Sequence, residues 1–289
     1  VRNSGVRSML AFGGHLTGFN VVNYFSRNLD KILIGRYCGT GPVGLYSQAY
    51  RLLKLPLQQI TTPIAAVAIP ALSRLQDESE RYRRYYYRAI NMIAFITMPL
   101  VVMLAALSDE FILIVLGKQW VEVGTIFKVL AFAALVQPVL STIGWVYISL
   151  GQTKRMMHWG FISVPVIILS FIVGLPWGAL GVAISYTLCA VLLIPVPGLF
   201  FAFRHSPVTV AGFFKAVWHP TIISLIMYAV IELAQRSFAI PGPVLVILYS
   251  FVIGVVTLLV ILAVWPGVRK EVLDVLKVIK MLRNQREDE

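Results

Sequence analysis

Long runs of uncharged, mostly apolar residues dominate this chain and restrict what it can fold into. Residues 89–107 and 129–153 contain no Asp, Glu, Lys or Arg, and residues 156–203 are uncharged apart from His158. A helix that crosses a bilayer needs about 20 apolar residues, so the first two runs can each span once and the third twice. Because 58% of the residues are hydrophobic and only 13% are charged, one water-soluble core could not bury the apolar surface.

Eight such stretches can be counted, which predicts an all-α integral membrane protein, a polytopic bundle of about eight transmembrane helices. The sequence Gly174-Leu175-Pro176-Trp177-Gly178 divides the longest run, because Gly and Pro favour a turn and Trp suits the membrane interface. The predicted spans are residues 8–34, 43–73, 89–107, 129–153, two within 156–203, 216–231 and 237–268.

The distribution of Lys and Arg between the spans predicts the orientation. With the N-terminus in the cytoplasm, 17 of the 25 basic residues fall in cytoplasmic segments and four, Arg36, Lys118, Lys128 and Arg236, fall in outer connections. Cytoplasmic connections are enriched in Lys and Arg, so we expect both termini in the cytoplasm. We therefore attribute the net charge of +12 to the basic residues that orient the spans in the membrane, and we expect no nucleic-acid partner.

Two basic segments on the predicted cytoplasmic side have a character of their own. Residues 74–88 mix five Arg with four Tyr, which suits anchoring at the lipid headgroups, with capture of lipid or substrate as the alternative. Residues 268–289 carry an apolar stripe at helical spacing, which predicts an amphipathic helix on the membrane surface, with a partner-binding helix as the alternative. The stripe consists of Val268, Val272, Val275, Ile279 and Leu282.

Charged residues inside the first two spans are the main anomaly, because each costs roughly 2.5–3.5 kcal/mol at mid-membrane unless it meets water or a partner. At about 100° per residue, the polar residues of each span share one face. Two neighbouring helices with such faces are expected to turn them toward one water-filled cavity. The predicted substrate-binding residues are Asn20, Asn23, Arg27, Asp30, Lys31, Tyr50, Arg51, Lys54 and Gln58.

The charge of this predicted cavity indicates an anionic ligand. Asp30 lies three residues from Arg27 and can pair with it, which leaves Lys31, Arg51 and Lys54 in surplus. Arg suits phosphate through its fork of donors, and Lys acts as a point charge. The alternative for Arg27 and Lys31 is that they snorkel to the outer interface.

Other chemistry finds no support in the sequence. There is no G-x-x-x-x-G-K-[ST] nucleotide-binding loop and no readable nucleophile–base constellation, so we do not expect an enzyme. The two cysteines, Cys38 and Cys189, are too few for a disulfide framework or a metal site. The pair Asp109-Glu110 is interpreted as a loop charge, and no cofactor, catalytic residue or metal ligand is predicted.

Motifs within residues 20–120 resemble one known family. Residues 23–36, NYFSRNLDKILIGR, resemble the seventh-span signature of the polysaccharide transporter family, the Wzx-type (WzxC-like) flippases of the multidrug/oligosaccharidyl-lipid/polysaccharide exporter superfamily. The resemblance continues through residues 44–52 (GLYSQAYRL), Leu55-Pro56, residues 70–76 (PALSRLQ) and residues 116–120 (LGKQW).

The resemblance implies a two-lobe bundle in which residues 1–203 form the second six-helix transmembrane lobe. Residues 204–267 would add two C-terminal transmembrane helices, residues 268–289 would be the cytoplasmic tail, and the first lobe of the same polypeptide is missing. The implied activity is flipping of undecaprenyl-diphosphate-linked oligosaccharide or exopolysaccharide units by alternating access, in lipopolysaccharide or exopolysaccharide export across the bacterial cytoplasmic (inner) membrane. Besides this lipid-linked substrate, the implied partners are membrane lipids and glycan polymerase and assembly proteins.

Two other functions are compatible with a polytopic membrane protein of this kind. A multidrug or ion-coupled antiporter of the same superfamily would favour a carboxylate-rich cavity, whereas only Asp30 is available here. A membrane-embedded surface-glycan polymerase or ligase would need a large outer loop with catalytic residues. The longest predicted outer connection, between residues 107 and 129, is too short for one.

Overall fold

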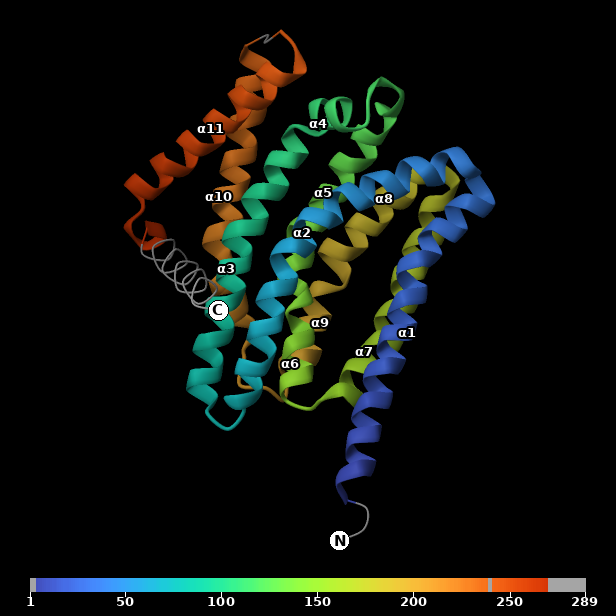
Figure 1. The fold of residues 1–289 in the computed structure, drawn as a ribbon, viewed down its shortest axis with the longest axis vertical. Coiled ribbons are helices and arrows are strands. Elements are labelled where there is room, and N and C mark those ends of the chain that lie inside the picture. Colours follow the sequence, from blue (N-terminus) through green and yellow to red (C-terminus); the bar gives the residue numbers. More distant parts are fainter. Residues whose placement is uncertain (1–3, 239–240, 270–289) are drawn as a thin grey trace, which may run out of the picture.

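The computed structural model describes residues 4–238 and 241–269, and every regular element in these ranges is helical. Figure 1 shows most of them as long rods that run along the molecule. Short 3₁₀ turns lie at Lys118–Trp120 and Leu175–Trp177, and a π-helical turn at Cys189–Leu193. The α-helices are α1 (Ser4–Cys38), α2 (Thr40–Arg74), α3 (Ser79–Ala106), α4 (Ser108–Val115), α5 (Glu122–Ser141), α6 (Ile143–Ser149), α7 (Thr153–Gly174), α8 (Gly178–Leu188), α9 (Pro195–Phe203), α10 (Val210–Ser237) and α11 (Pro243–Val264).

The helices confirm a multi-pass membrane protein. Six helical stretches in the described ranges are long and apolar enough to cross a bilayer. One of them, residues 153–203, folds back at Leu175–Trp177, so that α7 and α8–α9 form two passes (Figure 1). α1 has the length but is not among the six, because His, Asn and charged residues interrupt its apolar ones. With the two arms of the hairpin counted separately, these stretches give seven passes in the described residues, and a membrane pass by α1, the eighth predicted span, stays a prediction.

Glycines permit the sharp turns between neighbouring passes. Gly39, the single residue between α1 and α2, has a φ of 91°, in the left-handed region that favours glycine. At the α7–α8 turn the two backbones touch, since a Cβ on Gly174 would lie 2.5 Å from the carbonyl oxygen of Gly181. The turn predicted at residues 174–178 is therefore confirmed.

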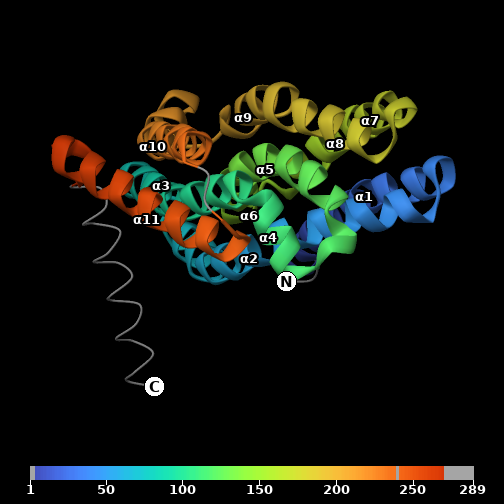
Figure 2. The ribbon, with the colours of Figure 1, turned by 90° about the horizontal axis from the view of Figure 1, so that it is seen from above.

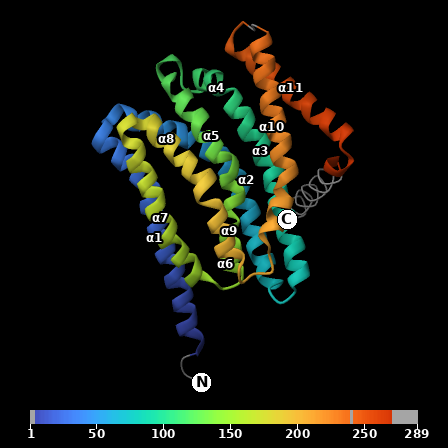
Figure 3. The ribbon, with the colours of Figure 1, turned by 180° about the vertical axis from the view of Figure 1, so that it is seen from behind.

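The passes are arranged in layers around α5. Viewed from above, α7, α8, α9 and α10 line one side, α1, α2 and α3 line the other, and α5 lies between (Figure 2). α3 packs on α10 and α5, and α1 packs along α7, an adjacency that is visible from both faces (Figures 1 and 3). α11 lies at the margin and contacts mainly α10 and α4.

A buried pair of hydroxyl groups and an arginine connect the helices at the end of the molecule where α2 joins α3. Tyr82 on α3 hydrogen-bonds Ser149 on α6 at 2.7 Å, and Arg83 Nε donates to the Pro207 carbonyl in the α9–α10 connection at 2.8 Å. This end also carries the α6–α7 connection and the start of α1 (Figure 1). The basic connections therefore gather at one end, as the alternation of predicted spans requires, and the side of the membrane that this end faces stays a prediction.

The structure corrects several predicted boundaries. α10 runs from Val210 to Ser237, well beyond residues 216–231, and Lys128 lies inside α5 instead of in an outer connection. The reason is that helices continue into the interface, where charged side chains are solvated, whereas hydropathy marks only their apolar centres. α11 ends at Val264, residues 270–289 of the predicted tail lie outside the described residues, and the division into domains stays a prediction.

Candidate functional site

The polar faces of α1 and α2 meet in a cavity of about 550 Å³, which we call the first cavity. The two helices join at Gly39 and diverge from there (Figure 1). Residues three and four apart share one face of a helix, so α1 presents Lys31 one turn from Asn28, and α2 presents Lys54 one turn from Tyr50. The lining residues are Asn20, Tyr24, Asn28, Lys31, Ser47, Tyr50, Arg51, Lys54, Leu55 and Gln58.

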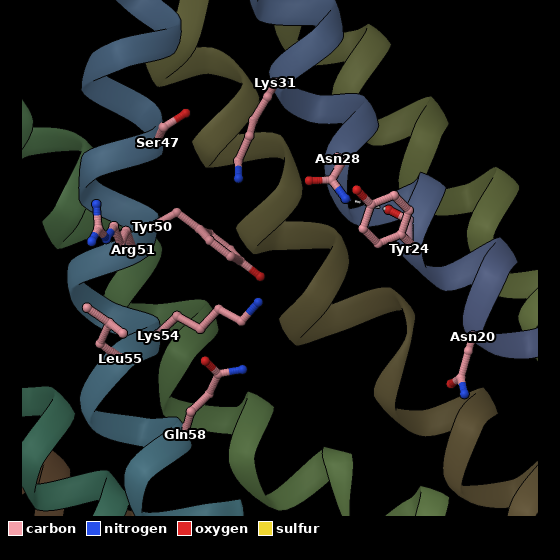
Figure 4. Close-up of a pocket in the computed structure, with 10 residues that line it drawn as sticks. All are labelled: Asn20, Tyr24, Asn28, Lys31, Ser47, Tyr50, Arg51, Lys54, Leu55 and Gln58. Atoms are coloured by element: carbon pink, nitrogen blue, oxygen red, sulfur yellow. Dashed lines mark hydrogen bonds between the residues drawn. The ribbon is translucent and has the colours of Figure 1, made fainter.

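Three basic side chains line the first cavity. Lys31 reaches into the space from α1, and Lys54 reaches into it from α2, with Arg51 one turn before Lys54 (Figure 4). The Lys54 amine lies 5.9 Å from the centre of the Tyr50 ring, within the range of a cation–π interaction. No carboxylate occurs among the described residues that line this cavity.

The structure brings most of the predicted site residues together. Six of the nine line the first cavity: Asn20, Lys31, Tyr50, Arg51, Lys54 and Gln58. The side chains of Asn23 and Arg27 lie outside what the structure describes, so the predicted Arg27–Asp30 pair stays a prediction. Asp30 belongs to a neighbouring space instead. That these residues bind a substrate also stays a prediction.

A second cavity of about 350 Å³ adjoins the first, and α2 supplies the shared wall. Tyr50, Lys54 and Gln58 line both spaces. The remaining lining of the second cavity comes from α1, α2, α5, α7, α8 and the segment after α8. These residues are Asp30, Leu57, Thr61, Gln137, Pro138, Leu140, Ser141, Ile167, Phe171, Tyr186, Ala190 and Ile194.

Asp30 is held at the inner side of α1 and is only 3% exposed. Its Oδ1 accepts a hydrogen bond of 2.7 Å from the backbone N–H of Lys31. The buried ring of Tyr46 brings its hydroxyl close to this carboxylate, but without the geometry of a hydrogen bond. The Tyr46 ring itself packs in the hydrophobic core.

The sequence matches proteins of surface-polysaccharide synthesis. Residues 1–125 match the family described as "Polysaccharide biosynthesis protein". The chain is 25% identical over 224 residues to the teichuronic acid biosynthesis protein TuaB of Bacillus subtilis, which covers 77% of this chain and 46% of TuaB. It is also 25% identical over 193 residues to the lipopolysaccharide biosynthesis protein WzxC of Escherichia coli, which covers 65% of this chain and 39% of WzxC. The chain is thus similar to polysaccharide biosynthesis proteins, among them the Wzx-type protein WzxC.

A solved structure confirms the fold of this chain. The lipid II flippase MurJ in an inward closed conformation is similar to it with a TM-score of 0.69 and 22% sequence identity. The match covers 86% of this chain and 52% of the MurJ chain. This chain thus spans about half the length, or less, of TuaB, WzxC and MurJ.

Sequence reasoning missed part of the second cavity. Gln137 on α5 and Tyr186 on α8 lie there within hydrogen-bond distance of each other, although both come from runs without charged residues. A search for charges passes over such neutral groups. The sequence feature that could have indicated this site is Gln137, an amide side chain beside Pro138 in a mostly apolar span.

A further polar cluster joins α5 to α10. Glu232 accepts from Lys128 Nζ at 2.6 Å and from the Tyr228 hydroxyl at 2.9 Å, and Arg236 Nη2 lies 3.6 Å from its other oxygen. Lys128 on α5 is therefore a nearer partner of Glu232 than Arg236 on the same helix. In the described residues no group of three His, Cys, Asp or Glu side chains could hold a metal ion.

Proposed function

We propose that this chain forms one half of a flippase for undecaprenyl-diphosphate-linked oligosaccharide or exopolysaccharide units, working by alternating access across the bacterial cytoplasmic membrane. One observation carries the proposal: Lys31, Arg51 and Lys54 line one cavity between α1 and α2. The described lining of this cavity carries positive charge, and the diphosphate of a lipid-linked sugar is negative. We therefore propose that the diphosphate binds to these three side chains.

The membrane setting explains why such a cavity would be maintained. A charged headgroup cannot enter hydrocarbon without a large loss of hydration energy. Basic side chains inside a span carry a similar cost, which falls when water or an anion faces them. When the anionic headgroup lies beside the basic side chains in one cavity, each lowers the cost of placing the other inside the membrane. The polyprenyl chain stays in the surrounding lipid.

The names of the relatives support a role in the synthesis and transport of surface polysaccharides. Besides TuaB and WzxC, the succinoglycan biosynthesis transport protein ExoT of Rhizobium meliloti is 24% identical over 262 residues, which covers 88% of this chain and 52% of ExoT. Because this chain spans about half of ExoT, we propose that a further lobe closes the opposite side of the first cavity during transport.

The proposal is tested on the full-length protein in proteoliposomes. Replacing Arg51 and Lys54 by Ala removes two charge-assisted contacts, and we expect outward movement of a labelled lipid-linked glycan to fall at least about tenfold. Lys118→Ala is the matched control, because Lys118 is exposed in the α4–α5 connection and lines neither cavity. Normal transport by the double variant at normal expression would rule out this use of the first cavity.

A further inference from the structure

The second cavity has a polar lining unlike that of the first. The first cavity carries three cations, whereas the groups that only the second cavity adds are one carboxylate, one amide, two aliphatic hydroxyls and one phenol. These groups belong to Asp30, Gln137, Thr61, Ser141 and Tyr186. The two spaces share Tyr50, Lys54 and Gln58, so a ligand could extend from one into the other.

The hydroxyl groups of the second cavity are arranged as hydrogen-bond acceptors. Thr61 Oγ1 donates its proton to the Leu57 carbonyl at 2.9 Å, and Ser141 Oγ donates to the Pro138 carbonyl at 2.7 Å. Each hydroxyl has one proton and two lone pairs, so both present lone pairs to the cavity. The Asp30 carboxylate adds a further acceptor, since the backbone N–H of Lys31 engages only Oδ1.

An amide and an aromatic wall complete this lining. The Gln137 side-chain amide donates to the Tyr186 hydroxyl, which leaves the amide oxygen as another acceptor. The rings of Phe171 and Tyr186 stand 5.5 Å apart, centre to centre, and form one side of the cavity. The π-helical turn Cys189–Leu193 includes Ala190 of the lining, and such turns are frequent at functional sites.

We propose that the second cavity binds the first sugar ring of the lipid-linked glycan. This inference rests on the proposed function, in which the first cavity holds the diphosphate. The sugar hydroxyls donate to Asp30, Thr61, Ser141 and Gln137, and the C–H face of the ring packs on Phe171 and Tyr186. A volume of about 350 Å³ lies within the range of small-molecule sites, roughly 300–1,000 Å³.

Other occupants fit this lining less well. A phosphate could bind Lys54, but it offers acceptors only and would face the Asp30 carboxylate and the other acceptors of this lining. A polyprenyl tail would leave several buried acceptors without a donor, which costs free energy. A monovalent cation could use Asp30, but it gives no role to the aromatic wall, and the experiment below separates it from a sugar.

Binding to the full-length protein in nanodiscs tests the inference with two probes, a prenyl diphosphate without sugar and the same prenyl diphosphate carrying one hexose. We expect the hexose to tighten binding at least about tenfold in the unaltered protein. Gln137→Leu should remove this gain and leave the Kd of the sugar-free probe unchanged. Gln59→Leu is the matched control, because Gln59 is exposed and lines neither cavity.

The outcomes separate this inference from the proposed function. Equal affinity for both probes in the unaltered protein overturns the sugar site and leaves the diphosphate site standing, whereas failure of both probes to bind overturns the proposed function. If Gln137→Leu removes a dependence on Na⁺ while the gain from the hexose persists, the second cavity is a cation site and the inference is wrong. Tyr186→Phe deletes only a hydroxyl and should also reduce the gain in affinity from the hexose. It replaces Gln137→Leu in this test if that variant does not fold.

Discussion

The amine of Lys54 lies 5.9 Å from the centre of the Tyr50 ring, one turn away on α2, and both residues line the first and the second cavity. This pair therefore stands at the boundary between a space lined by basic residues and a space lined by acceptors and aromatic rings. Its position suits the bond between a diphosphate and the first sugar of a lipid-linked glycan.

The charge of Lys54 should control binding of the diphosphate. Lys54→Met keeps much of the side-chain volume and removes the charge, so we expect the Kd of a sugar-free prenyl diphosphate to rise about tenfold. Lys54→Arg should bind nearly as well as the unaltered protein. Raising the salt concentration from about 0.05 M to about 0.5 M should weaken binding in the unaltered protein more than in Lys54→Met, because ions screen the attraction. Titration of the probe at each salt concentration measures all three effects, and identical salt dependence in both proteins would contradict the assignment.

The close approach at the α7–α8 turn should make Gly174 intolerant of a side chain. A Cβ there would lie 2.3 Å from Ser185 Oγ and 2.5 Å from the Gly181 carbonyl oxygen, and backbone cannot move aside cheaply. We expect Gly174→Ala to destabilise the fold by about 1–3 kcal/mol, measured as a lower Tm in detergent.

Gly13→Ala on α1 is the matched control for this change. A Cβ on Gly13 would meet nothing within 4 Å, and its φ is not in the left-handed region. Alanine favours a helix over glycine, so the Tm of Gly13→Ala should stay level or rise slightly. A Gly174→Ala protein as stable as this control would show that α7 and α8 can separate without cost.

Glu232 should anchor α10 to α5. The carboxylate is bonded to Lys128 and Tyr228 and its side chain is 19% exposed, so Glu232→Gln should cost about 1–3 kcal/mol of stability. Arg236→Gln should cost less than about 1 kcal/mol, because the Arg236 side chain is 81% exposed. Thermal unfolding of the two variants checks the order, and equal losses would show that the Lys128 contact adds nothing.

Sequence reasoning worked where charge and hydropathy carry the information. The charged residues of the first two spans indicated a shared polar space, and six of the nine predicted residues do line the first cavity. The turn after Gly174 followed from Gly and Pro in a long apolar run. Both features depend on the local sequence alone, which is why they could be predicted.

The second cavity could not be predicted in the same way. Its lining combines Asp30 from α1 with Gln137 from α5 and Tyr186 from α8, and no local pattern states which helices become neighbours. The sequence pattern predicts Asp30 on the same face as Lys31, but adjacent residues on a helix point about 100° apart. The backbone N–H of Lys31 bonds the Asp30 carboxylate on the inner side, while the Lys31 amine reaches into the first cavity.

Site-specific photo-crosslinking tests the central claim most directly, because it reports where the headgroup passes in the full-length protein. A photoreactive residue would replace Ser47 or Asn28, which line the first cavity, or the exposed Gln59, which does not. During transport of a labelled lipid-linked glycan, we predict capture of the glycan at positions 47 and 28 and none at position 59. Capture at position 59 alone, or no capture at 47 and 28 while transport proceeds normally, would contradict the account.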